Sequence, residues 1–203
     1  MIPLESFLPE VLTHAPACPD PTARNSLINA ARTFCERTRL WRDWDRFNIT
    51  PDACNVACAP VGAELFEVDE ALLNQRSLQP VTLAELRAIN PNWRDEQGQG
   101  NYFVLDGTGG VTITPRGTGS LTLIMILRPS LDAEFLPEVL GQYRKLIAAG
   151  ALSELLMIPG QPFSAPDRAQ YFQAMFKEGL ESLFTRNVQG QQRAPLRTRP
   201  HYF

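Results

Sequence analysis

The sequence predicts an α+β protein in which an antiparallel bundle of long helices carries an inserted small antiparallel β-sheet or sandwich. Apolar residues recur every three to four positions near 21–42, 133–158 and 165–188, the spacing that places side chains on one face of a helix. Over about 47–127 the period changes, and short apolar segments separated by Pro, Gly and Asn indicate strands and turns.

The last two predicted helices form a hairpin. Pro159 and Gly160 end the first of them, because proline removes a backbone donor and glycine accepts a left-handed turn. Ser164 begins the second, with Asp167 three residues later as in a capping box. So short a connection favours antiparallel packing of the two apolar faces.

The first helix of this hairpin also carries a run of small residues. Ala148, Gly150 and Ala151 permit close approach of another backbone. That approach can occur within the domain or to a neighbouring subunit, so these three are candidate subunit-interface residues.

The strand block contains one recognisable hairpin and one central strand. Residues 102–105 and 111–114 flank a glycine-rich turn, and 121–127 is too apolar for a strand with one wet face. Thr82 and Glu85 form a capping box that predicts a short helix inside the block.

The predicted organisation is one domain over 1–190, with the β insertion inside it, followed by an extended C-terminal arm at 191–203. A chain of 203 residues is long enough to bury one core and carry an arm. The last residues, GQQRAPLRTRPHYF, show no apolar period and include two prolines, so no helix or strand is expected there.

The net charge of −3 hides an asymmetry along the chain. Residues 186–203 contain four arginines and no acid, a charge of +4, which leaves 15 basic against 22 acidic residues, or −7, for the rest. An acidic body with a basic tail indicates an arm that binds a partner. The bulky Tyr202 and Phe203 at its end could anchor in a groove of that partner.

Targeting signals and membrane spans are not expected. The longest apolar run, 121–127, is far shorter than the ~20 residues of a membrane span. The first residues lack the basic start of a secretory signal, which predicts a cytoplasmic site of synthesis.

The residue types that carry catalysis are sparse. The sequence contains no G-x-S-x-G, and its two histidines, His14 and His201, lie in the terminal segments. The glycine clusters lack the Lys-Ser/Thr of a phosphate loop, and the four cysteines lack the spacing of a zinc site. The protein is therefore predicted not to be an enzyme and to hold no cofactor or metal.

Three segments together resemble the head-to-tail adaptor (connector, or head-completion) proteins of tailed, especially short-tailed, bacteriophages. They are FLPEVLTHAPACPDPTARNSLINAARTFCERTRLWR at 7–42, LRPSLDAEFLPEVLGQYRKLIAAGALSELLMIPGQPFSAP at 127–166, and APLRTRP at 194–200. The resemblance implies a virion protein without enzymatic activity. It also implies a ring, usually of twelve copies, in the neck between the portal protein and the tail tube or nozzle, with DNA passing through its channel without sequence recognition.

In that interpretation the helices form the ring wall and its subunit contacts, and the arm reaches a portal subunit. The candidate portal-docking residues are Arg193, Leu196, Arg197, Arg199, Tyr202 and Phe203. The alternative is a nucleic-acid-binding protein that uses the basic arm. The −7 body disfavours this alternative, because neutralisation of phosphates supplies most of the affinity for DNA.

Overall fold

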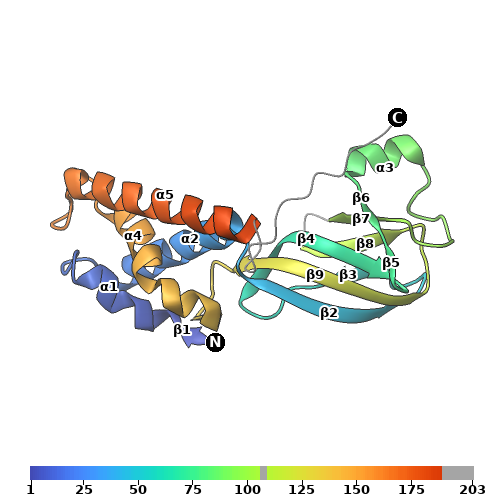
Figure 1. Cartoon of the computed structure of the whole chain (residues 1–203), viewed down its shortest axis with the longest axis horizontal. Coiled ribbons are helices and arrows are strands. Elements are labelled where there is room, and N and C mark those ends of the chain that lie inside the picture. The colour runs from blue at the N-terminus through green and yellow to red at the C-terminus, as the bar shows by residue number, and fades with distance from the viewer. Residues whose placement is uncertain (106–108, 189–203) are drawn as a thin grey trace. The chain divides into compact units, whose positions relative to one another are not determined.

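The computed structural model describes residues 1–105 and 109–188 and divides into two compact units (Figure 1). The helical unit comprises Met1–Leu40 and Leu131–Phe203, and the β unit comprises Trp41–Ser130. The β unit is therefore inserted between two parts of the chain that fold together.

The helical unit contains most of the helical residues of the chain and one short pair of strands. Its elements are β1 Ile2–Pro3, the 3-10 helix η1 Leu4–Phe7, α1 Leu8–Leu12, α2 Asp20–Thr38, β10 Phe135–Leu136, the 3-10 helix η2 Glu138–Tyr143, α4 Arg144–Leu155 and α5 Pro166–Val188. Strands β1 and β10 pair antiparallel, which brings the start of the chain beside the segment that follows the insertion.

Helix α2 has clear start and stop signals. Asp20 lies in its first turn and Pro21 follows, where a missing N–H costs nothing. Arg39 closes the helix in the left-handed conformation, with φ of 53°, and its N–H donates to the Cys35 carbonyl. The buried side chains between these ends include Leu27 and Phe34, both fully shielded from solvent.

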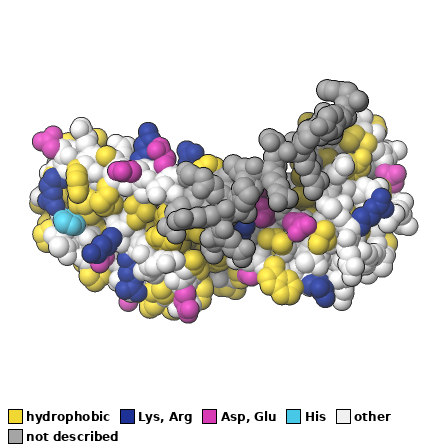
Figure 2. Space-filling view, in the orientation of Figure 1, with side chains coloured by type: hydrophobic (Ala, Val, Ile, Leu, Met, Phe, Trp, Pro, Cys, Tyr) yellow, Lys and Arg dark blue, Asp and Glu magenta, His cyan; other side chains and the backbone are white. Residues whose placement is uncertain are grey.

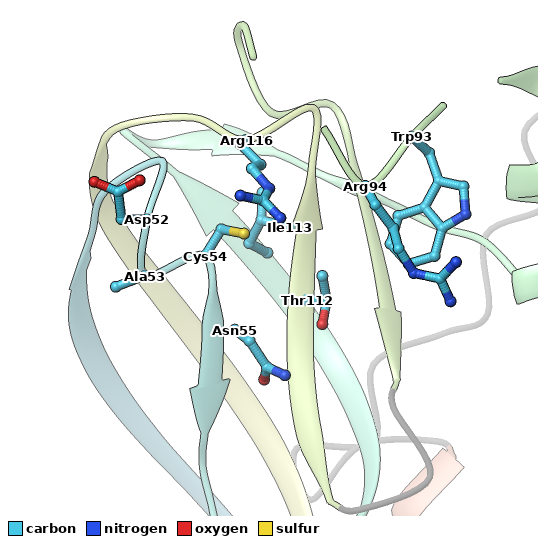
Figure 3. Close-up of a pocket in the computed structure, with 9 residues that line it drawn as sticks. All are labelled: Asp52, Ala53, Cys54, Asn55, Trp93, Arg94, Thr112, Ile113 and Arg116. Atoms are coloured by element: carbon cyan, nitrogen blue, oxygen red, sulfur yellow. The ribbon is translucent and has the colours of Figure 1, made fainter. Parts of the chain in front are cut away.

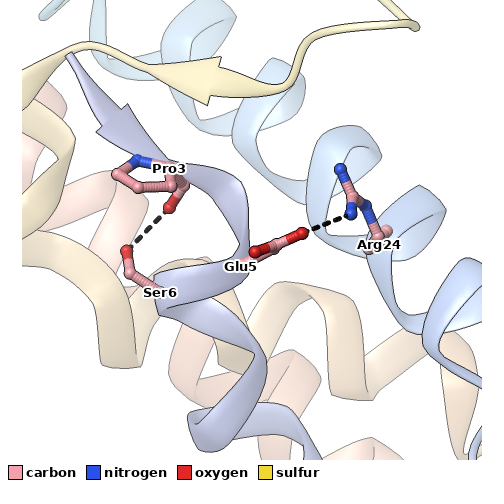
Figure 4. Close-up of polar contacts among 4 residues, drawn as sticks. All are labelled: Pro3, Glu5, Ser6 and Arg24. Carbon is pink, nitrogen blue, oxygen red and sulfur yellow. Dashed lines mark hydrogen bonds and ion pairs between the residues drawn. The ribbon is translucent and has the colours of Figure 1, made fainter.

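One polar contact joins the N-terminal segment to α2, and a second lies within the segment itself (Figure 4). Arg24 Nη1 donates to Glu5 Oε1 at 2.9 Å, and Ser6 Oγ donates to the Pro3 carbonyl at 2.8 Å. Both contacts are exposed, so burial of Leu4 and Phe7 beneath them contributes most of the stability here.

The predicted bundle of three long helices is wrong, although the α+β class is compatible with the structure. The α-helices have 5, 19, 7, 12 and 23 residues, and strands form three sheets. The predicted helix 133–158 is instead a strand, a 3-10 helix and then α4. Pro137, which has no N–H, stays extended at ψ of 149°, and pairing of β10 with β1 keeps Phe135–Leu136 out of a helix. The predicted helix near 21–42 likewise ends at Thr38, and Arg42 already lies in a strand.

The same six residues, FLPEVL, occur at 7–12 and again at 135–140 and fold differently. The first copy leads into α1, with Phe7 fully buried, whereas the second begins as β10, with Phe135 48% exposed. Local sequence alone therefore does not decide the conformation of this hexapeptide.

The β unit consists of two four-stranded sheets, one lying behind the other in Figure 1. Its elements are β2 Arg42–Ile49, β3 Asn55–Ala57, β4 Ala63–Leu73, β5 Arg76–Ser77, β6 Gln79–Pro80, α3 Leu83–Ile89, β7 Tyr102–Leu105, β8 Gly110–Thr114 and β9 Gly119–Pro129. The strand orders are β2-β9-β4-β5 and β3-β8-β7-β6, with one parallel pair, β6 with β7.

The predicted hairpin and central strand are both present. Strands β7 and β8 pair antiparallel, and β9 lies between β2 and β4. Almost all inward side chains of β8 and β9 are fully buried, including Val111, Ile113, Leu121, Leu123, Met125 and Leu127. Burial of these alternating residues, and of Ile126 as well, accounts for most of the apolar content of 121–127, whereas Thr122 and Ile124 between them are only partly buried.

The capping box of α3 also forms as predicted. Glu85 N–H donates to Thr82 Oγ1 at 3.2 Å, and Thr82 N–H donates to Glu85 Oε2 at 2.8 Å. Hydrogen bonds from the Thr82 backbone and then from its hydroxyl lower the pKa of Glu85. The ionised form of Glu85 is therefore favoured in the folded protein.

Glu154, on α4, provides a test of the packing against α2. Burial raises the pKa of this carboxyl, and a hydrogen bond with Asn29 of α2 offsets only part of that effect. A raised pKa in the folded state means that the carboxyl favours folding at low pH and that this contribution is lost as pH rises through the folded pKa.

We therefore expect Glu154→Gln to raise the melting temperature at pH 7, with the advantage disappearing as the pH falls below the ordinary glutamate pKa of 4.5. Thermal unfolding, followed by circular dichroism at pH 7 and at a pH below 4.5, measures both melting temperatures. Glu178→Gln, at an exposed position of α5, is the control. A Glu154→Gln effect of equal size at both pH values would contradict the explanation by ionisation.

Candidate functional site

The predicted docking arm lies outside the described residues. This applies to all six candidate residues, Arg193, Leu196, Arg197, Arg199, Tyr202 and Phe203. Their role stays a prediction, and the described residues offer other candidate surfaces for binding a partner.

The predicted interface residues lie in the middle of α4 and are buried within the helical unit. Ala148 is 2% exposed, Ala151 is fully shielded, and Gly150 is also buried. A Cβ atom placed on Gly150 would lie 2.9 Å from the Phe176 ring of α5 and 3.0 Å from Ala30 Cβ of α2. The small side chains thus permit close approach within the unit, which was one of the two alternatives. A role between subunits stays a prediction.

A groove of about 610 Å³ lies between the C-terminal part of α2 and α5. The apolar side chains that line it are Phe176, Leu180 and Phe184, and Phe184 is 47% exposed. The charged residues that line it are Glu36, Arg37, Arg39, Lys177 and Glu181. On the face of the helical unit shown in Figure 2, hydrophobic side chains likewise lie among charged ones.

The apolar spacing of 165–188 does not reveal this groove, because it predicts a single core-facing stripe made of Phe172, Met175, Phe176, Leu180, Leu183 and Phe184. Phe172 and Leu183 are buried as expected, but Phe184 is not. The stripe is wider than one helix contact needs, and this excess width was the available signal for a second, partly exposed apolar face.

The β unit carries a second cavity, of about 370 Å³, at one end of the sheet that contains β3 and β8 (Figure 3). It is lined by Asp52, Ala53, Cys54, Asn55, Trp93, Arg94, Thr112, Ile113 and Arg116. The Arg94 guanidinium lies 4.7 Å from the centre of the Trp93 ring, a cation–π contact that orients it. In Figure 3, the Arg94 side chain lies beside the Trp93 ring, and the Arg116 side chain lies near Cys54 and Ile113.

The four cysteines, Cys18, Cys35, Cys54 and Cys58, are free and buried. Burial raises the pKa of Cys35 to about 12, with a smaller contribution from the nearby Glu36 carboxylate. This thiol therefore stays protonated, and hence weakly reactive, at neutral pH. Within residues 1–105 and 109–188, no three His, Cys, Asp or Glu side chains gather as metal ligands would.

A membrane-spanning helix has to be both long and apolar. No helix within 1–105 and 109–188 combines the necessary length and apolarity.

Comparison with protein families gives a match over nearly the whole chain. The family described as SU10 adaptor protein matches residues 4–199. The chain belongs to the SU10 adaptor protein family. Among curated proteins, no sequence matches it.

Membership in this family confirms the predicted resemblance to phage head-to-tail adaptors. The protein is accordingly a phage adaptor and a virion component that associates with other virion proteins. The match includes both helical segments of the resemblance, 7–42 and 127–166, and extends across the β unit between them. It also includes part of the C-terminal arm.

The position of Gly150 gives a test of how closely the adaptor's helices pack. We expect Gly150→Val to lower the free energy of unfolding by about 1–3 kcal/mol, because the added carbons would displace Phe176 or Ala30. Chemical denaturation measures this change. Gly98→Ala is the control, since its new Cβ would meet Pro115 at an ordinary 3.5 Å. Unchanged stability of Gly150→Val would contradict tight packing at this site.

Proposed function

We propose that this adaptor assembles into a ring of twelve copies in the neck of a tailed phage, between the portal protein and the tail nozzle or tube. DNA passes through the channel of the ring without sequence recognition, and no catalytic step is involved. The observation that carries the proposal is the family match over residues 4–199, because it covers both units.

The distribution of charge supports docking through the C-terminal arm. Residues 186–203 carry +4, while the remainder of the chain carries −7. Arginines of the arm would meet carboxylates of the portal, and its terminal aromatic side chains would enter apolar pockets. Binding must offset the entropy of ordering the arm, and twelve arms acting together supply avidity.

The same charge distribution supports a channel through which DNA can slide. Tight binding to duplex DNA needs many Lys or Arg contacts to phosphates. A body with 15 basic and 22 acidic residues disfavours such contacts. The opposite arrangement, in which the arm itself binds DNA, is the alternative that the experiments must distinguish.

The first experiment measures mass. The purified chain is mixed with the portal ring encoded by the same phage, and native mass spectrometry or light scattering records the complex. We expect a gain of about one ring of subunits per portal, and we expect deletion of 191–203 to weaken this binding by about tenfold or more. Undiminished binding of the truncated chain would contradict the role of the arm, and no complex at all would contradict portal docking.

Matched variants separate the charges of the arm from its apolar end. One variant replaces Arg193, Arg197 and Arg199 with Gln, and a second replaces Tyr202 and Phe203 with Ala. The control replaces three exposed arginines of the β unit, Arg46, Arg76 and Arg87, with Gln and so removes the same total charge. Only the arm variants should weaken portal binding.

Binding to duplex DNA is measured with the same proteins at several salt concentrations. We expect weak binding with little salt dependence. A steep loss of affinity with salt that disappears in the arginine variant of the arm would instead support the nucleic-acid alternative.

A further inference from the structure

Strand β2 forms an exposed edge of the β unit. It pairs with β9 along all eight of its residues, and no described strand pairs with its other side (Figure 1). Residues 42–46 are all exposed, and Trp44 retains 65% of its accessible surface. Long exposed edges are sites where another chain can add a strand, so proteins generally protect them.

The direction of each backbone group on β2 follows from its pairing. In an antiparallel pair, the backbone N–H and C=O of one residue point toward the partner strand, and those of the next residue point away from it. The Trp41 carbonyl accepts a hydrogen bond from the Leu127 N–H of β9, with N···O of 2.9 Å. Residues 43 and 45 therefore face β9 as well, and the N–H groups of Trp44 and Arg46 point outward.

These two outward N–H groups are already occupied. Trp44 N–H donates to Oδ1 of Asp43 at 2.9 Å, and Arg46 N–H donates to Oδ1 of Asp45 at 2.7 Å. Each aspartate thus binds the amide of the residue that follows it. A strand that added to this edge would need the same two donors and would have to displace both carboxylates.

We propose that Asp43 and Asp45 close the free edge of β2 against antiparallel pairing with β2 of a second copy of this chain. A second copy is the relevant partner because every copy carries the same eight-residue edge, and antiparallel pairing of an edge with itself satisfies two-fold symmetry. Such pairing would also cover the exposed Trp44. This inference concerns the β unit alone and is independent of the proposed ring.

A second property of the strand gives a competing explanation. The sequence Arg42-Asp43-Trp44-Asp45-Arg46 is the same in both directions. Antiparallel pairing centred on Trp44 would therefore place Arg opposite Arg and Asp opposite Asp, which is unfavourable. The edge could be closed by this repulsion rather than by the hydrogen bonds, and substitutions can separate the two.

The test uses the full chain with two double variants. Asp43→Ala with Asp45→Ala removes both the acceptors and the charges, whereas Asp43→Asn with Asp45→Asn removes the charges and keeps an acceptor oxygen at each position. Asp95→Ala, at an exposed position of the same unit, is the control for loss of an acidic side chain. Sedimentation velocity over a concentration series measures the mass of each protein.

The alanine variant is expected to associate more strongly than the wild type, with its average mass rising with concentration. The asparagine variant and Asp95→Ala are expected to match the wild type. Association of the asparagine variant to the same extent as the alanine variant would overturn the proposal in favour of charge repulsion. An alanine variant that matches the wild type would overturn it as well.

Hydrogen exchange provides a readout that does not depend on association. At low concentration, the amides of Trp44 and Arg46 should exchange about five-fold faster in the alanine variant, since each loses a hydrogen bond of about 1 kcal/mol. Unchanged exchange at these two amides would overturn the proposal. Exchange of the β9 amides shows whether the variant remains folded. If the double variant unfolds, the single variants Asp43→Ala and Asp45→Ala replace it, because each frees one outward N–H group, that of Trp44 or of Arg46.

Discussion

The helical unit depends on the close approach of α4 and α5, and each helix contributes a glycine to it. The Phe176 ring of α5 occupies the space beside Gly150 of α4, and the Leu146 side chain of α4 occupies the space beside Gly179 of α5. Each glycine thus accepts a large side chain from the facing helix, and the apolar area buried in this way stabilises the pair. Gly150 also lies close to Ala30, so α4 packs closely against α2 at the same position.

The β unit has a corresponding centre in β9. This strand pairs with β2 on one side and β4 on the other, and its side chains form much of the core between the two sheets. The edge strands of this sheet are β2 and the two-residue β5, which pairs with β4. In this unit the edge at β2 is exposed over most of its length, and aspartate side chains occupy two of its outward donors.

An adaptor associates with other virion components and therefore has to offer surfaces to them. Each of the two units buries its own set of apolar side chains, and the strongest local positive charge of the sequence lies in residues 186–203. The groove between α2 and α5 adds a partly apolar surface on the helical unit. This groove is one candidate surface for protein contact, consistent with the family to which the chain belongs.

The sequence by itself determined the elements whose signals are local. The capping box at Thr82, the hairpin of β7 and β8, and the buried strand at 121–127 all follow from residue types and spacing, because hydrogen bonds or burial within a few residues decide them. The family resemblance was likewise available from the sequence, since it depends on residue order. The asymmetry of charge was available for the same reason.

Only the tertiary structure decided the features that depend on distant partners. The FLPEVL segment at 7–12 buries Phe7 and Val11, whereas its copy at 135–140 buries Leu136 and Leu140, because pairing of β10 with β1 turns the second copy in a different direction. The same limit applies to Phe184, whose exposure depends on where α2 lies, and to the small residues of α4, which contact helices of their own unit. An apolar period identifies a face that avoids water, but the partner that covers this face is set by contacts between segments far apart in the chain.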